Sequence, residues 1–110
     1  MTYITFYQDS DGVVTGFETR GHAGYAEYGE DIICAAISAL VINTVNSVEE
    51  FTEDAFTVDT DSESGQIIFK LETKPSKETA LLLNSLILGL QNMEDDEENR
   101  QYIDVIFEEV

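Results

Sequence analysis

Residues 21–38 read GHAGYAEYGEDIICAAIS and decide how the chain is organised. They hold the only histidine, His22, and the only cysteine, Cys34. A glycine-bearing loop separates the two, and Asp31 is the residue type that caps the amides of a helix N-terminus. A thiol in the first turn of a helix, approached by an imidazole from a loop, is an arrangement that activates a cysteine nucleophile. The stretch therefore predicts that His22 and Cys34 form a catalytic pair.

The segments on either side of this stretch alternate between strand and helix periodicity. Asp11-Gly12 is a strong hairpin signal between the first two strand-like segments. The order strand, strand, helix, strand, strand, helix, strand predicts an α+β fold, with a mixed or antiparallel sheet that carries both helices on one face. The predicted strands are residues 2–8, 13–20, 55–60, 65–72 and 102–110, and the predicted helices run from about 32 to about 51 and from 75 onward.

Both predicted helices are rich in apolar residues. Residues 32–42 are apolar nearly all round, which predicts a central helix buried on several sides. The second helix has Leu83, Ile87 and Leu90 at helical spacing and further leucines beside them. A homodimer interface would use this surplus, and ordinary core packing would also absorb it.

Composition excludes several classes of protein. The 110 residues suit a single domain over residues 1–110. Twenty-three acidic and five basic residues give a formal net charge of -18. Direct binding to nucleic acid is not expected, because affinity for phosphates needs clustered Lys and Arg. The acidic surface would attract a basic partner, or would serve solubility alone.

Localisation and cofactors also follow from the sequence. The N-terminal residues lack the pattern of a signal peptide, and the apolar runs are too short and interrupted to span a bilayer. We therefore expect a soluble cytoplasmic protein without membrane association. One cysteine forms no internal disulfide. One Cys and one His would leave two zinc ligands to be found among carboxylates, so no metal is expected. We expect no other cofactor.

Residues around the predicted pair suggest how it would work. His22 would act as general base towards the thiol and then as acid towards the leaving amine. Backbone amides of Cys34 and Ala35 would hold the oxyanion if they lie in the first helical turn. Ser38 lies one turn beyond Cys34, where it would bond the thiol, the histidine, the substrate or the carbonyl of residue 34. The sequence identifies no third residue as the orienter of His22. Asp31 is one candidate, although it cannot easily cap the helix and hold the ring at once.

The same residues resemble a known family signature. Gly21-His22-Ala23, then Gly29, then DIICAAIS over residues 31–38, is similar to the motif of the ribosomal-processing cysteine protease (Prp) family. The family commonly has valine where Ile33 and Ile37 stand here, a mild change for the chemistry.

The resemblance implies a bacterial cysteine endopeptidase. Such an enzyme removes the short N-terminal extension of a large-subunit ribosomal protein, and its substrate is a basic precursor. It implies a homodimer of α+β fold, with His22 and Cys34 as catalytic residues. It further implies that Gly21 serves loop mobility and that Asp31 and Ser38 support the site.

Two other classes of function stay open on the sequence. One is a non-catalytic acidic module that binds a basic ribosomal protein without cutting it. The other is a small thiol hydrolase that acts on non-peptide esters.

Overall fold

The computed structural model describes residues 1–21, 28–61 and 63–110. The elements alternate as the sequence predicts, and the strand boundaries agree to within two residues. They are β1 (Thr2–Gln8), β2 (Val14–Arg20), α1 (Tyr28–Phe51), β3 (Phe56–Thr60), β4 (Ile67–Leu71), α2 (Lys77–Asp95) and β5 (Ile103–Glu109).

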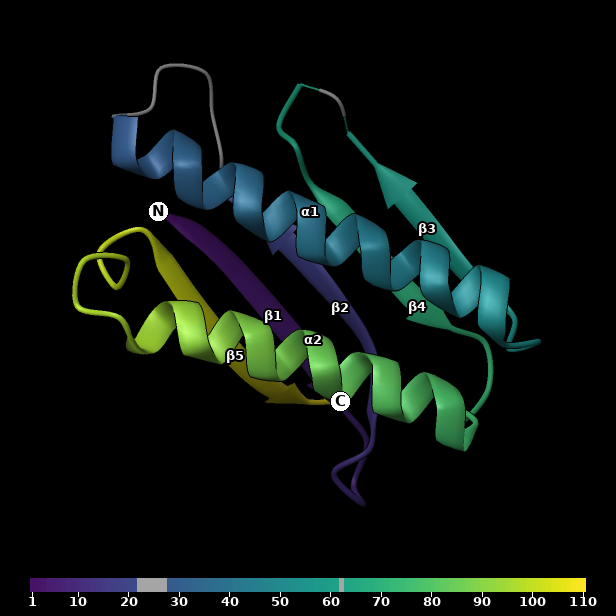
Figure 1. The fold of residues 1–110 in the computed structure, drawn as a ribbon. Helices are drawn as coiled ribbons and strands as arrows, with labels where there is room; N and C mark the ends of the chain where they lie inside the picture. Colours follow the sequence, from purple (N-terminus) through teal and green to yellow (C-terminus); the bar gives the residue numbers. More distant parts are fainter. Residues whose placement is uncertain (22–27, 62) are drawn as a thin grey trace.

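The five strands form one mixed sheet in the order β3-β4-β2-β1-β5. Neighbouring strands are antiparallel except β1 and β5, which are parallel. Both helices lie side by side over the same face of the sheet (Figure 1). Helix α2 joins β4 to β5 and crosses over the sheet between them. This crossover lets β5 run parallel to β1 at the edge of the sheet. The predicted α+β fold with two helices on one face is therefore confirmed.

A row of phenylalanines crosses the helix-covered face of the sheet. Each strand contributes one ring, and neighbouring ring centroids lie 5.0–5.7 Å apart. Aromatic pairs at this spacing contribute about 0.5–1.5 kcal/mol each beyond the area that they bury. The row is Phe107, Phe6, Phe17, Phe69 and Phe56, in the order of the strands from β5 to β3.

Helix α1 packs on this row through one stripe of side chains. Ile33, Ile37, Val41 and Val48 belong to the same buried cluster as the central phenylalanines. The opposite side of α1 is open, however, with Ile32 51% exposed and Ile42 50% exposed. The sheet and α2 thus bury α1 on two sides, as predicted for a central helix, but the prediction that it has no exposed side is wrong.

The apolar length of α1 raises the question of a membrane. By length and composition, residues 32–51 could cross a bilayer, contrary to the sequence-based expectation. One stripe of these residues is buried in the core against the sheet. The core helix of a soluble protein has the same length and apolar composition, so packing in the core also accounts for them.

A carboxylate links the end of α1 to the start of α2. The amide and the hydroxyl of Ser76, the N-cap of α2, both donate to Asp54 at 2.8 Å. The hydroxyl of Thr79 and these two groups of Ser76 hold the pKa of Asp54 below its usual range. Hydrogen bonds to the ionised form favour it, so the carboxylate stabilises the fold while it is charged.

We predict that Asp54→Asn lowers the free energy of unfolding at pH 7 by about 1 kcal/mol, the contribution of a typical hydrogen bond. Because folding lowers this pKa, the contribution is present above the unfolded value of 3.8 and is lost as the pH falls through the folded value. Urea unfolding of parent and variant should therefore converge as the pH falls below that range.

Asp59→Asn, at an exposed position on β3, serves as the control and should change the unfolding free energy by less than about 0.5 kcal/mol. An equal loss in Asp54→Asn at pH 7 and well below pH 3.8 would contradict a role for the charged form.

Candidate active site

Cys34 lies in the second turn of α1. The helix begins at Tyr28, four residues earlier than the sequence predicts. Asp31 therefore lies inside the helix, and its prediction as the N-cap is wrong. The amides of Cys34 and Ala35 also belong to the helix interior, where each N–H donates to the carbonyl four residues before it. The predicted oxyanion site at these two amides is therefore wrong as well.

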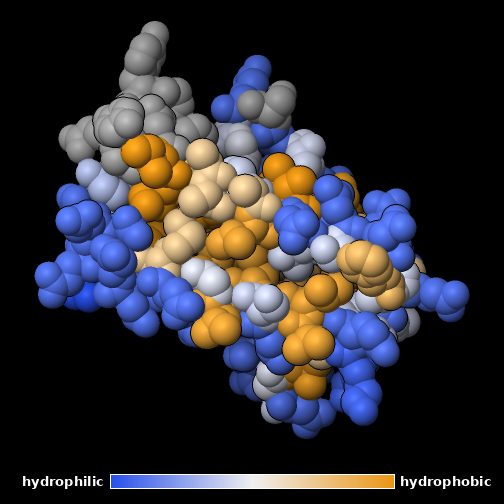
Figure 2. Space-filling model, in the orientation of Figure 1, coloured by the Kyte–Doolittle hydropathy of each residue, from blue (hydrophilic) through white to orange (hydrophobic). Residues whose placement is uncertain are grey.

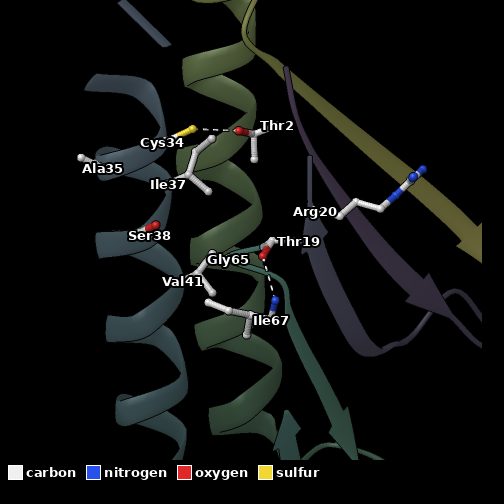
Figure 3. Close-up of a pocket in the computed structure, with 10 residues that line it drawn as sticks. All are labelled: Thr2, Thr19, Arg20, Cys34, Ala35, Ile37, Ser38, Val41, Gly65 and Ile67. Atoms are coloured by element: carbon white, nitrogen blue, oxygen red, sulfur yellow. Dashed lines mark hydrogen bonds between the residues drawn. The ribbon is translucent and has the colours of Figure 1, made fainter. Parts of the chain in front are cut away.

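A cavity opens beside the thiol. It has a volume of about 300 Å³ and lies between α1, the starts of β1 and β4, and the end of β2. Cys34 is 9% exposed, so its sulfur lies at the edge of the core and borders this cavity. The lining residues are Thr2, Thr19, Arg20, Cys34, Ala35, Ile37, Ser38, Val41, Gly65 and Ile67 (Figure 3).

Two buried threonines on the sheet are polar residues of the cavity wall. Thr2 Oγ1 lies 3.0 Å from Cys34 Sγ, and either atom can be the donor. Thr19 Oγ1 accepts from the amide of Ile67 at 3.2 Å, which ties β2 to the start of β4. Figure 3 shows the side chains of Thr2 and Cys34 pointing towards one another. The sheet thus presents a hydroxyl directly to the sulfur.

Arg20 contributes to the rim of the cavity, and its charged group is directed away from the centre (Figure 3). Its guanidinium lies over the ring of Tyr3, 5.1 Å from the centroid. Tyr3 is on the face of β1 opposite Thr2, because successive side chains of a strand alternate. Figure 3 accordingly shows Arg20 pointing away from the thiol.

A smaller apolar cavity adjoins the first. It has a volume of about 160 Å³, and Val41 and Ile67 line both cavities. The two together extend the hollow along α1 from the thiol towards β3. The second is lined by Val41, Ile42, Val45, Asn46, Val58, Thr60 and Ile67.

Gly21 occupies a position that only glycine fits. Its φ of +96° is in the left-handed region, and an added Cβ would lie 2.6 Å from the carbonyl oxygen of Met1. The end of β2 therefore lies tightly against the start of β1. This is a physical reason for Gly21 besides the loop mobility that the family resemblance implies.

The structure brings together some of the predicted site residues. Cys34 and Ser38 line the same cavity, one helical turn apart, and Ser38 is exposed. Gly21 directly follows Arg20 of the rim. His22 lies outside the described residues, as does the side chain of Asp31.

The sequence analysis missed the two threonines. Strand alternation in β1 puts Thr2 on the same face as Ile4 and Phe6, which form the core. A polar residue at an inward position of a strand needs a partner, and this was the available signal.

Within residues 1–21, 28–61 and 63–110, no group of three or more His, Cys, Asp and Glu side chains could hold a metal ion.

Comparison with known proteins identifies the class. The chain matches the family described as cysteine protease Prp over residues 1–104. The ribosomal processing cysteine protease Prp of Staphylococcus aureus is 30% identical over 96 residues, which cover 87% of this chain and 91% of that protein.

Two solved structures of the S. aureus enzyme show the same fold. One, in complex with a substrate peptide, has a TM-score of 0.90 at 27% identity, and the alignment covers 98% of this chain and 100% of the other. The other, with a covalently linked product peptide, has a TM-score of 0.86 at 28% identity and the same coverage.

The fold and the thiol-lined cavity thus belong to a cysteine protease. The chain is a member of the Prp family of cysteine proteases.

We predict that Gly21→Ala lowers the free energy of unfolding by about 2–4 kcal/mol, through both the left-handed φ and the collision with the Met1 carbonyl. Gly12→Ala is the matched control. Gly12 also has a positive φ, +80°, but an added Cβ meets nothing within 4 Å, so only the backbone strain of about 1–2 kcal/mol remains. Denaturant unfolding of both variants measures the difference, and equal losses would contradict the role of the Met1 contact.

Proposed function

We propose that the chain is an endopeptidase that removes the N-terminal extension of a bacterial large-subunit ribosomal protein, with Cys34 as nucleophile and His22 as its base. The observation that carries the proposal is that the sulfur of Cys34 borders a cavity large enough for a peptide side chain. The related S. aureus enzyme binds a substrate peptide and forms a covalent link to a product peptide. We take the whole chain, residues 1–110, as one protease domain.

The proposed reaction begins with transfer of the Cys34 proton to His22. The thiolate attacks the scissile carbonyl carbon, a C–S bond forms, and the peptide C–N bond breaks. The imidazolium of His22 returns the proton to the leaving amine, which is the new N-terminus of the ribosomal protein. Water, deprotonated by His22, then hydrolyses the thioester and releases the extension as a carboxylate.

The place of His22 in this reaction rests on the sequence. Gly21, immediately before it, is held against the start of β1. Thr2 of the same strand lies 3.0 Å from the sulfur. Gly21, directly after β2, is thus held near the cavity, which supports a histidine at the next position of the sequence as the base.

Ser38 and Asp31 take supporting roles in the proposal. Ser38 lines the cavity one turn from Cys34 and is exposed, which favours a hydrogen bond to the peptide backbone over one within the helix. Asp31 belongs to the first turn of α1, three residues before Cys34 in the sequence. We assign Asp31 the role of orienting His22.

The substrate in this proposal is an extended peptide that belongs to a basic protein. The two adjoining cavities offer apolar surface to the side chains of the extension. The net charge of -18 would speed the encounter with a basic ribosomal precursor and oppose binding to nucleic acid. Such a partner places the enzyme in the cytoplasm.

We predict that Cys34→Ala abolishes cleavage of a synthetic peptide that spans the junction between the extension and the mature ribosomal protein. His22→Ala should lower kcat/KM by about a hundredfold or more, the usual contribution of a general acid and base. Mass spectrometry of the peptide products measures both and gives the junction.

Ser10→Ala, at an exposed serine of the turn between β1 and β2 and outside both cavities, is the control and should cut like the parent protein. Continued turnover by Cys34→Ala would exclude covalent catalysis by the thiol. Binding of the peptide by the parent without cleavage would instead favour the acidic binding module.

We also propose that two copies of the chain form a homodimer. Leu81 and Leu88 are exposed and lie seven residues apart, on the same side of α2. Figure 2 shows apolar side chains gathered over the helix-covered side of the molecule, with hydrophilic ones around them. Ile32 and Ile42 of α1 add to this exposed apolar surface.

Light scattering should give twice the chain mass of 12.3 kDa. We predict that Leu88→Glu reduces the mass to that of one chain, because a buried unpaired charge disfavours an interface. Thr57→Glu adds the same charge at an exposed position of β3 and should leave the dimer intact. A parent mass of one chain would contradict the dimer, and an intact dimer in Leu88→Glu would exclude this surface of α2.

A further inference from the structure

Thr2 is held rigidly beside the sulfur of Cys34. Its amide donates to the carbonyl of Tyr102 at 2.8 Å, and it pairs with Ile103 at the start of the parallel strands β1 and β5. The residue is 5% exposed, and a β-branched side chain has few rotamers. The contact of 3.0 Å between Thr2 Oγ1 and Cys34 Sγ is therefore set by the sheet rather than by a flexible side chain.

The chemistry of this contact depends on the state of the sulfur. A neutral thiol and a hydroxyl can each donate to the other. A thiolate has no hydrogen, so in that state the hydroxyl of Thr2 is the donor of this pair and the sulfur is the acceptor. Ionisation of Cys34 thus fixes the direction of the hydrogen bond, and a hydrogen bond to a charged group is stronger than one between neutral groups.

The position of Cys34 within α1 makes such a donor useful. Free amides and the positive end of the dipole act within the first turn of a helix. Because α1 begins at Tyr28, Cys34 lies beyond that turn, and its own amide is part of the helix. A side-chain donor from the sheet can therefore stabilise the thiolate where the free amides of the helix N-terminus do not reach.

We propose that Thr2 is a positioning residue of the protease: its hydroxyl holds Cys34 Sγ at the wall of the cavity and donates a hydrogen bond to the thiolate. This inference rests on the proposed function for the role of Cys34. Thr2 neither gains nor loses a proton in the reaction, because the proton of Cys34 passes to His22. Thr2 tunes the nucleophile and is not required for the bond-breaking steps.

Alkylation of the thiol tests the inference without any substrate. Cys34 is the only cysteine, so intact-mass measurement of iodoacetamide labelling reports on this sulfur alone. The rate is measured from pH 5.5 to 9.5 on the full chain. Thr2→Val keeps the shape of the side chain and removes the hydroxyl, whereas Thr2→Ser keeps the hydroxyl.

At pH 7, Thr2→Val should be labelled about threefold to tenfold more slowly than the parent, the equivalent of one hydrogen bond. The difference should become smaller as the pH rises, because only the thiolate is alkylated and high pH favours it without help from the hydroxyl. Thr2→Ser should stay within about twofold of the parent at all pH values.

Thr5→Val is the matched control. Thr5 is buried on the same strand but on the opposite face of the sheet, so its loss should leave the pH profile unchanged. Melting curves check that each variant folds, and Thr2→Ala replaces Thr2→Val if the latter does not.

The inference is overturned if the labelling profile of the folded hydroxyl-free variant coincides with that of the parent, or if Thr5→Val shifts it equally. Failure of the proposed function would look different. In that case Cys34→Ala would still cut the junction peptide, whatever the labelling profiles show.

Discussion

The burial of one stripe of α1 against the sheet determines where the sulfur can be. Ile33, Ile37, Val41 and Val48 belong to the core cluster. Each fully buried aliphatic side chain contributes about 1.5–3 kcal/mol, so the stripe outweighs the single hydrogen bond between Thr2 and Cys34. Packing thus sets the position of the helix, and the hydrogen bond adjusts only the side chain that the helix presents. Cys34 directly follows Ile33 of the stripe, which puts its sulfur at the boundary between core and cavity.

The sheet shows how much of the fold could be predicted. Alternation in residues 2–8 and the Asp11-Gly12 turn predict β1 and β2, and the structure pairs them with Phe6 opposite Phe17. Both signals depend only on residues that are close together in the sequence, so contacts with distant residues do not alter the elements that they predict. The order of the strands in the sheet was not predicted, because it depends on contacts between residues that are far apart in the sequence, such as Phe17 and Phe69.

The start of α1 shows where local signals mislead. Gly29 suggested a loop and Asp31 a cap, yet the helix contains both. Glycine costs a helix about 1 kcal/mol, which the tertiary packing of a long apolar helix can override. Acidic residues also favour the first turn of a helix, so Glu30 and Asp31 agree with a start at Tyr28. The sequence thus identified Cys34 and Ser38 as neighbours but misplaced the helix end on which the predicted oxyanion site depended.

The central claim is that Cys34 forms the covalent bond with the substrate. The most direct measurement is rapid-quench mass spectrometry of the protein mixed with the junction peptide. If Cys34 is the nucleophile, a transient adduct with the mass of the acyl extension forms, is located by fragmentation at Cys34 and is removed by hydroxylamine. Cleavage of the peptide by protein whose Cys34 has been fully alkylated beforehand would contradict it.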